Sequence, residues 1–279
     1  MGLFLSCEEM WDRPLGGVSE EKQLPHWAGN LIYGFVAAIF KVCFRYHVDG
    51  LENIRAFDKK SGVVVVCNHT SFLDTVFMYI TGRPRQWIRL LGRESLFKNA
   101  GGLVGQILTR VGAFPIKRDA ADLTAIKRAA RMLKNKELVG IFPEGTRRGK
   151  GSQDIELHSG AAFIARMGKA PILPMTVRNA ENIKKKGSFF RFPQVTIEYG
   201  NPILVSDFDF LPKDERLDGC IWYAMRECFA LSLYCGSEEV DMASLFPEAK
   251  DYTQIFKDHV VPRHTTYELV SDKNTNQIK

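Results

Sequence analysis

Short apolar runs alternate with stretches of helical spacing through the middle of the chain. Residues 63–67, Val-Val-Val-Val-Cys, contain no charged or strongly polar side chain, which is typical of a strand buried on both faces. Similar runs predict strands at residues 87–91, 138–142 and 171–177. Because strands that alternate with helices form mostly parallel sheets, we predict an α/β fold with a single mixed, mostly parallel sheet flanked by helices.

The same patterns predict the remaining elements. Residues 112–118 form a short strand, which Pro115 places at a sheet edge because proline cannot donate to a neighbouring strand. Residues 119–122 open a helix with four apolar positions at helical spacing. These positions are Leu123, Ile126, Ala130 and Leu133. Further strands are predicted at residues 44–48 and 195–199, further helices at 51–57, 72–80, 158–167 and 216–234, and a basic turn at 184–186.

The chain before the first strand divides into a polar lead-in and an apolar stretch. Residues 8–25 are polar and contain proline and glycine, so we expect a surface segment. Residues 31–40 carry no charge, but this run is too short for a comfortable bilayer span. Two interpretations of residues 27–44 stay open: a buried core helix, or an amphipathic membrane-docking helix with Trp27 and Tyr33 near the headgroups. The position ahead of the α/β alternation favours docking.

These patterns divide the chain into three parts. They are an N-terminal lead-in and interfacial helical segment (1–44), the main α/β domain (45–235) and a polar C-terminal extension (236–279). Within the main domain, the glycine-rich, apolar residues 99–108 are either a membrane- or ligand-facing segment or a helix packed closely through its glycines. No basic region precedes a long apolar core at the start of the chain, so we expect no signal peptide.

Composition and charge limit the possible partners. The 279 residues are 45% hydrophobic and 25% charged, as in folded proteins. The net charge of +6 favours an anionic partner, whether a membrane surface, a phosphorylated substrate, an acidic carrier protein or nucleic acid. No motif of interleaved aromatic and basic residues supports nucleic-acid binding. The six cysteines have neither Cys-x-x-Cys nor zinc-finger spacing, so we expect a reduced compartment and no metal site.

A polar cluster follows the strand at residues 63–67. Ser71 is predicted to cap the next helix, which puts Asp74 at the third helical position and His69 just outside. Asp74 could then serve only to satisfy backbone donors. However, a loop at the carboxyl end of a parallel strand is where open α/β sheets bind ligands. From this stretch alone, the structural and catalytic interpretations stay equally open.

Other charged residues follow neighbouring predicted strands. Because the carboxyl ends of parallel strands meet at one edge of a sheet, we expect these side chains to gather there. The set comprises His69, Asp74, Arg93, Arg118, Glu144 and Arg147. This clustering favours a functional site over six separate structural roles.

These residue types suit proton transfer beside a phosphate. His69 can act as a general base near neutral pH, and a carboxylate such as Asp74 on its other ring nitrogen would fix the tautomer. The nucleophile would be a substrate hydroxyl, because no Gly-x-Ser-x-Gly motif occurs and Cys67 lies in an apolar strand. The arginines offer fork-shaped donors to phosphate. Glu144 would orient these arginines, and Gly145 would allow a close approach of the backbone.

Four blocks of the chain resemble the motifs of the 1-acyl-glycerol-3-phosphate acyltransferases. Residues 68–74, Asn-His-Thr-Ser-Phe-Leu-Asp, are similar to the family's Asn-His-x-Ser-x-x-Asp block. Residues 112–118, 142–147 and 171–174 resemble the second, third and fourth blocks. All four occur in the family's order, and the resemblance covers residues 44–201.

The resemblance implies roles for individual residues. In that family the histidine of the first block deprotonates the acceptor hydroxyl and the aspartate orients it, roles that fall to His69 and Asp74. The second and third blocks are associated with holding the acceptor's phosphate. The residues to which this role falls, with Arg93 added for its charge, are Arg118, Glu144, Gly145, Thr146 and Arg147. The family also docks on membranes through an amphipathic helix pair ahead of the core, which matches residues 27–44.

The resemblance implies an enzyme of phospholipid biosynthesis that moves a fatty acyl group from a thioester to lysophosphatidic acid, giving phosphatidic acid. The expected partners are a lysophospholipid acceptor, an acyl-CoA or acyl carrier protein donor and the membrane surface, with no cofactor or metal. We expect a peripheral or monotopic protein on the cytoplasmic face. Two alternatives stay open: the same chemistry on another lysophospholipid, a glycolipid or an amino-acid-derived lipid, and a catalytically silent membrane-binding protein.

The chain departs from the family pattern in three places. Arg93 stands where many members have lysine, and Arg148 stands where many have serine. We expect Arg148 to add positive charge near the phosphate. Residues 99–105 are also richer in glycine than is usual. These departures bear on headgroup and chain-length selectivity and leave the acyl transfer itself unchanged.

Overall fold

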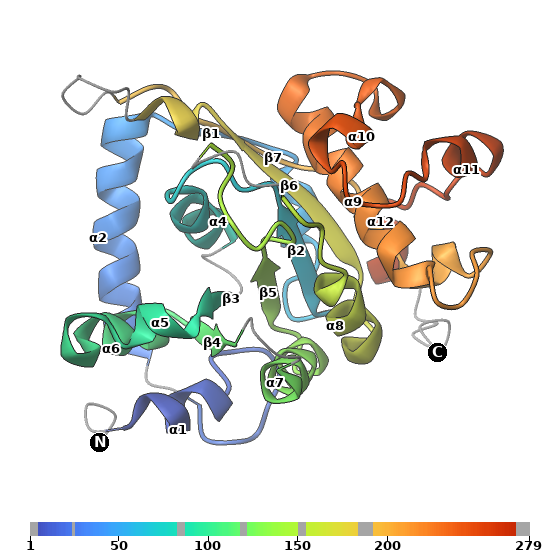
Figure 1. Cartoon of the computed structure of the whole chain (residues 1–279). Coiled ribbons are helices and arrows are strands. Elements are labelled where there is room, and N and C mark those ends of the chain that lie inside the picture. Colours follow the sequence, from blue (N-terminus) through green and yellow to red (C-terminus); the bar gives the residue numbers. More distant parts are fainter. Residues whose placement is uncertain are drawn as a thin grey trace.

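A seven-stranded sheet forms the centre of the computed structural model (Figure 1). The structure describes residues 5–23, 26–82, 87–117, 122–149, 155–183 and 192–271. The strands run in the order β1-β7-β6-β2-β5-β3-β4, and every neighbouring pair is parallel except β6 and β7. They are β1 (His47–Asp49), β2 (Val63–Cys67), β3 (Ile88–Arg93), β4 (Phe114–Ile116), β5 (Leu138–Ile141), β6 (Ile172–Arg178) and β7 (Thr196–Tyr199). The predicted single mixed, mostly parallel sheet is confirmed.

Strand β2 lies in the middle of this sheet. All five of its residues are buried, as the unbroken apolar run predicts. It pairs in parallel with β5 on one side and β6 on the other, with Val66 opposite Ile141 and Pro174. Because β2 and β5 end at nearly the same level, the loops that follow them leave the sheet side by side.

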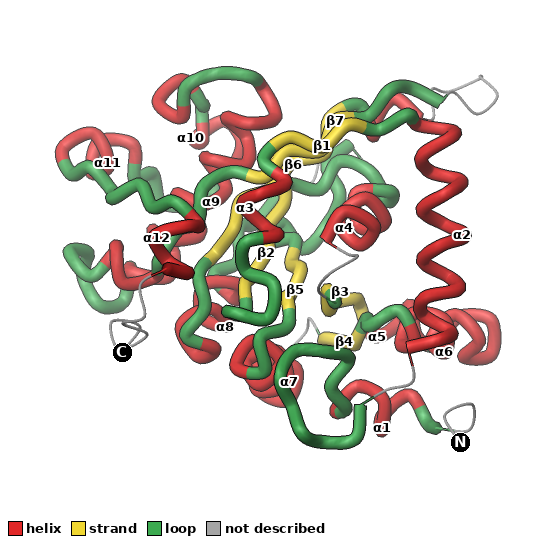
Figure 2. Tube along the Cα trace, turned by 180° about the vertical axis from the view of Figure 1, so that it is seen from behind, coloured by secondary structure: helices red, strands yellow, loops and turns green. Residues whose placement is uncertain are grey.

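Helices cover both faces of the sheet, and alternate residues of β2 point into two separate cores. Helices α7, α8 and α9 pack on one face, and α2, α3 and α4 pack on the other (Figures 1 and 2). The helices are α1 (Cys7–Asp12), α2 (His26–Phe44), α3 (Leu51–Arg55), α4 (Asp74–Gly82), α5 (Glu94–Phe97), α6 (Leu103–Arg110), α7 (Leu123–Lys134), α8 (Gly160–Gly168), α9 (Arg216–Leu233), α10 (Met242–Leu245), α11 (Thr253–Asp258) and α12 (Thr266–Ser271).

Helix α7 shows where the predicted periodicity holds and where it fails. Asp122 caps it by accepting a hydrogen bond from the backbone N–H of Ala125 at 3.0 Å. Ala130 and Leu133 are buried as predicted, but Leu123 is 58% exposed. Leu123 is the first helical residue, so it lies at the very end of the apolar stripe. The predicted basic turn at residues 184–186 lies outside the described residues.

The N-terminal lead-in is folded against the main body, which corrects the expectation of a surface segment. Met10 and Leu15 are buried in a cluster with Trp87. Beneath them, the Nε of Arg89 lies 3.0 Å from Oε2 of Glu137, and both side chains are almost fully buried. Arg89 also donates a hydrogen bond of 2.7 Å to the backbone carbonyl of residue 13. Arg89, which is held in a buried charge pair with Glu137, thus ties the lead-in to β3, a strand that is distant in sequence.

The segment after α9 packs on that helix. Phe246, Tyr252, Phe256 and Val261 are buried in the same core cluster as α9. The ring centres of Trp222 in α9 and Phe256 in α11 are 5.5 Å apart. Residues 236–271 therefore share a core with the main domain, and α10 and α11 lie beside α9 (Figure 1).

Helix α2 stands at the outer edge of the molecule (Figures 1 and 2). One side packs on α4, with Phe40 5.2 Å from Phe77 between ring centres. The opposite side is exposed and apolar. Its exposed large residues are Trp27, Leu31, Phe35, Ile39 and Val42. Among the described residues, no helix combines the length and apolar character that crossing a membrane requires.

Residues 99–108 form a short 3-10 turn, η2 (Asn99–Gly102), and the first part of α6. A Cβ atom on Gly105 would lie 2.3 Å from the backbone oxygen of Phe97, so this glycine permits close packing on α5. Leu103 and Ile107 of the same helix are exposed. The predicted close packing through a glycine is confirmed at Gly105. The other side of the segment presents apolar side chains outward, and its role in facing a membrane or ligand stays a prediction.

Candidate active site

His69 and Asp74 lie together at the carboxyl end of β2. The Nδ1 of His69 is 3.2 Å from Oδ2 of Asp74, whose side chain is fully buried. The same oxygen accepts hydrogen bonds from the backbone N–H groups of Thr70 at 2.8 Å and Ser71 at 2.7 Å. Three donors therefore converge on one carboxylate oxygen, which fixes the position of the carboxylate and of the loop around it.

The contacts of Asp74 fit both interpretations that the sequence left open, the structural one and the catalytic one. Its carboxylate satisfies the backbone of Thr70 and Ser71, and it also contacts His69. The predicted cap is wrong in detail. Ser71 Oγ accepts from the N–H of Leu73 at 3.3 Å, and α4 begins at Asp74, so Asp74 is the first helical residue and not the third. The carboxylate folds back over the turn that precedes the helix.

The imidazole of His69 is oriented by two contacts. Its ring stacks on Phe142 with centres 4.1 Å apart and planes 27° apart. Because an ionised carboxylate only accepts hydrogen bonds, Asp74 requires a proton on Nδ1. The other ring nitrogen, Nε2, then carries the lone pair, and the side chain remains 15% exposed. This arrangement places an oriented and partly exposed imidazole at the sheet edge.

The loop after β5 is bonded to the backbone of His69 on both sides. Oε1 of Glu144 accepts a hydrogen bond from the His69 N–H at 3.3 Å, and the N–H of Arg148 donates to the His69 carbonyl at 2.8 Å. The Nε of Arg148 lies 2.9 Å from Oε2 of Glu144, whose side chain is fully buried. Burial raises the pKa of Glu144 to about 7, and the charge of Arg148 opposes that rise.

The third sequence block adopts a tight turn around Gly145. Gly145 has φ of +62°, and an added Cβ would lie 3.2 Å from the ring of His158. Glycine is therefore favoured by the positive φ, and an added Cβ would crowd the His158 ring. Thr146 is exposed, and its N–H donates to the Glu144 carbonyl at 2.6 Å. The guanidinium of Arg147 lies 5.4 Å from the ring centre of Phe72 and makes no ion pair within the described residues.

The predicted arginines are not all brought together. Arg93 ends β3, two strands from β2, and its exposed side chain forms no ion pair within the described part of the chain. Arg118 lies outside the described residues. We expected Arg148 to add positive charge beside a phosphate. In the structure its guanidinium instead pairs with Glu144 and lies near two aromatic rings. The structure therefore gathers His69, Asp74, Glu144, Gly145, Thr146 and Arg147.

Two buried polar residues were missed as functional candidates. Asn68 is 2% exposed, and its Oδ1 accepts a hydrogen bond from Oγ1 of Thr176 at 2.9 Å. This bond links the end of β2 to β6. A threonine inside the apolar run 171–177 was the available signal, because a buried hydroxyl needs a partner.

The thiol of Cys67 remains unsuited to nucleophilic attack, since burial raises its pKa well above the usual value.

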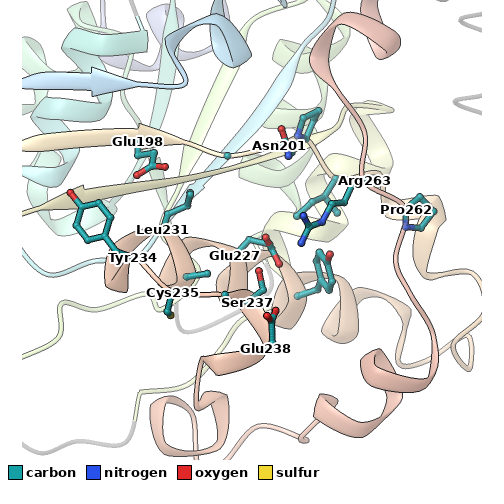
Figure 3. A pocket seen from close by; sticks show the side chains of 16 residues that line it. Glu198, Asn201, Glu227, Leu231, Tyr234, Cys235, Ser237, Glu238, Pro262 and Arg263 are labelled. Carbon is teal, nitrogen blue, oxygen red and sulfur yellow. The ribbon is translucent and has the colours of Figure 1, made fainter.

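A pocket of about 410 Å³ lies elsewhere, between β7, α9 and the segment after α9 (Figure 3). Its polar lining includes Glu198, Asn201, Glu227 and Arg263. None of the predicted site residues lines it. No group of three or more His, Cys, Asp or Glu side chains within the described ranges is placed to hold a metal ion.

Comparisons with known proteins match both the sequence and the fold. The family description "Acyltransferase" matches residues 45–178. The 1-acyl-sn-glycerol-3-phosphate acyltransferase of Bacillus subtilis is 34% identical over 190 residues, which cover 67% of this chain and 89% of that protein. The enzyme of the same name from Streptococcus pneumoniae is 34% identical over 145 residues, 52% of this chain and 51% of the relative. The chain thus matches about half the length of this second protein.

A solved structure shares the fold. The 1-acyl-sn-glycerophosphate acyltransferase PlsC from Thermotoga maritima aligns with a TM-score of 0.53 and 24% sequence identity. The alignment covers 73% of this chain and 79% of that one. The sheet and its flanking helices therefore have a counterpart of known structure.

The raised pKa of Glu144 predicts a dependence of stability on pH. A carboxyl whose pKa is higher in the folded chain binds more protons when folded. The free energy of unfolding therefore falls as the pH rises from the ordinary pKa of a glutamate toward about 7. Glu144→Gln removes this loss. Between about pH 5 and about pH 8, we expect the variant to gain about 2 kcal/mol relative to wild type in urea denaturation.

The matched control is Glu94→Gln, which removes a carboxylate from the partly exposed Glu94–Lys98 pair on α5. It should follow the pH profile of the wild type. Parallel profiles for wild type and Glu144→Gln would contradict the assignment of a buried, proton-binding carboxyl.

Proposed function

This chain belongs to the 1-acyl-sn-glycerol-3-phosphate acyltransferase family, and on that premise we propose that it moves a fatty acyl group from a thioester to the free hydroxyl of lysophosphatidic acid, giving phosphatidic acid. The observation that carries the proposal is the His69–Asp74 pair. A buried carboxylate holds one ring nitrogen, and the other nitrogen belongs to a partly exposed side chain at the sheet edge. This is the arrangement that a general base requires.

The reaction follows from this arrangement. Nε2 of His69 takes the proton of the acceptor hydroxyl while the hydroxyl oxygen attacks the thioester carbonyl carbon. The new C–O bond forms, the C–S bond breaks, and the leaving thiolate takes the proton back from Nε2. Asp74 stabilises the imidazolium that exists between the two proton transfers. No covalent enzyme intermediate, cofactor or metal ion takes part in these steps.

Arg147 is the best placed described residue for the acceptor's phosphate. It follows Glu144 and Gly145 in the loop bonded to His69, and within the described chain its guanidinium has no carboxylate partner. An arginine fork suits two phosphate oxygens. Arg93 and Arg118 remain proposed contributors through their positions at the ends of predicted strands. Acyl-CoA and acyl carrier protein are the two proposed donors.

Substitution of the pair tests the base. His69→Ala should lower kcat by about 10²- to 10⁴-fold, because the proton acceptor is lost. In Asp74→Asn, the amide oxygen can still accept from the backbone, but its NH₂ would favour the wrong tautomer of His69. We therefore expect a loss of comparable order. The measurement is product mass after incubation of the purified chain with lysophosphatidic acid and each donor.

His47→Ala is the matched control, because His47 pairs with Asp49 at 2.9 Å in an exposed position on β1. It should retain wild-type turnover. Folding and vesicle binding of all three variants should match wild type. Retained turnover in His69→Ala would overturn the catalytic assignment. If the wild-type chain acylates a different lysolipid and not lysophosphatidic acid, the proposal moves to the alternative acceptors.

We also propose that the chain works at a membrane surface as a peripheral or monotopic protein of the cytoplasmic face. Helix α2 has an exposed apolar side, and α6 exposes the apolar side chains of Leu103 and Ile107. The two helices adjoin: a Cβ on Gly29 of α2 would lie 3.0 Å from the carbonyl oxygen of Arg110, the last residue of α6 (Figure 1). Exposed apolar side chains on two adjoining helices of a chain with net charge +6 suit an anionic bilayer.

The double variant Leu31→Asp/Phe35→Asp tests this surface. Both residues are more than two-thirds exposed, so the fold should tolerate the change. Each aspartate removes an apolar contact with lipid and adds repulsion from anionic headgroups, so we expect at least about 10-fold weaker partitioning onto anionic vesicles in flotation assays. Val260→Asp, at an exposed apolar residue in the C-terminal segment, should bind as wild type does. Equal binding by the double variant would contradict the docking surface.

A further inference from the structure

Arg148 connects three parts of the molecule that are distant in sequence. Its Nε pairs with Oε2 of Glu144 at 2.9 Å, and its Nη2 donates to the backbone carbonyl of Leu245 at 3.2 Å. The guanidinium lies 4.8 Å from the ring centre of Phe229 in α9 and 4.6 Å from that of Phe246, which follows α10. One side chain therefore contacts the loop after β5, helix α9 and the C-terminal segment.

These contacts require a guanidinium. The guanidinium forms an ion pair with Glu144 through Nε, Nη2 donates to the carbonyl of Leu245, and the planar group lies near two aromatic rings. A lysine ammonium would supply charge but not a planar group with two fixed donor directions. Phe246 is buried, so the neighbouring carbonyl of Leu245, which accepts from Arg148, belongs to a packed part of the C-terminal segment.

The charge on Arg148 determines what Glu144 can do. Glu144 is buried, and its Oε1 accepts from the His69 N–H while Oε2 faces Arg148. A buried carboxylate without a cation takes up a proton or moves toward solvent. Either change weakens the bond to His69. The backbone N–H of Arg148 holds the His69 carbonyl as well, so the main chain of the histidine is held from both sides.

We propose that Arg148 is a positioning residue through which the C-terminal segment, residues 236–271, fixes the main chain of His69. The kinetic part of this inference rests on the proposed function. Asp74 orients the imidazole ring, and the Arg148–Glu144 pair fixes the position of the His69 backbone that carries this ring. Arg148 itself touches neither the ring nitrogens nor the acceptor's phosphate, and it acts through Glu144.

Steady-state kinetics of Arg148→Met, Arg148→Lys and Glu144→Gln test the proposal. We expect Arg148→Met to lower kcat at least about 10-fold while KM for acceptor and donor changes less than about 3-fold, because the side chain contacts neither substrate. Arg148→Lys should recover part of kcat, since it restores charge but not the fork. The double variant Arg148→Met/Glu144→Gln should lose no more than the worse single variant, because both residues act in one chain of contacts.

Hydrogen exchange separates this proposal from the assignment of the reaction. The His69 amide should exchange at least about 10-fold faster in Arg148→Met than in wild type, whatever the substrate proves to be. Arg216→Met is the matched control. Arg216 is the first residue of α9, and it pairs with Asp209 at 2.8 Å and donates to two backbone carbonyls of the preceding loop. It should leave both kcat and His69 exchange unchanged.

Several results would overturn the proposal. Wild-type kcat and wild-type His69 exchange in folded Arg148→Met would exclude the positioning role. A selective rise in KM for the phosphorylated acceptor would assign Arg148 to phosphate binding, and additive losses in the double variant would make the two residues independent. If Arg148→Met does not fold, Phe246→Leu removes one aromatic neighbour of the guanidinium, and it should speed His69 exchange with the same sparing of KM. Unchanged exchange there contradicts the proposal.

Discussion

The site depends on one buried charge. Asp74 has no solvent exposure, and transfer of a carboxylate from water into a protein interior costs several kcal/mol unless donors replace the water. Here three N–H groups meet Oδ2, two from the backbone and one from His69. The loop between β2 and α4 is therefore fixed by the need to solvate one carboxylate. The same donors that stabilise the charge place the histidine beside it.

The sheet register makes this arrangement possible. Strands β2 and β5 are parallel neighbours that end with Val66 opposite Ile141, so the loops carrying His69 and Glu144 begin side by side. Glu144 and Arg148 then bond to both backbone polar groups of His69. Asn68 binds Thr176 on the other neighbour, β6. Ring orientation thus depends on the loop itself, whereas the position of the main chain depends on strands and segments that are distant in sequence.

Local patterns carried enough information to predict the sheet, the buried β2 and the meeting of His69 with Asp74. Each of these depends on residue types that are close in sequence or on the general rule that parallel strands end at one edge. The contacts of Arg148 were not predictable in this way, because its partners Leu245 and Phe246 lie about a hundred residues later and carry no motif. The burial of the lead-in was missed for the same reason: its polar composition hides Met10 and Leu15, whose partner Trp87 lies far along the chain.

In the proposed mechanism, Asp74 holds His69 with its proton on Nδ1 and leaves Nε2 as the base. Long-range proton–nitrogen NMR spectra of the chain labelled with nitrogen-15 in its six histidines test this directly, with a His69→Gln sample to assign the signal. We expect the Nδ1–H tautomer in the uncharged form of His69, and its replacement by the Nε2–H tautomer in Asp74→Asn. An Nε2–H tautomer in the wild type would contradict it.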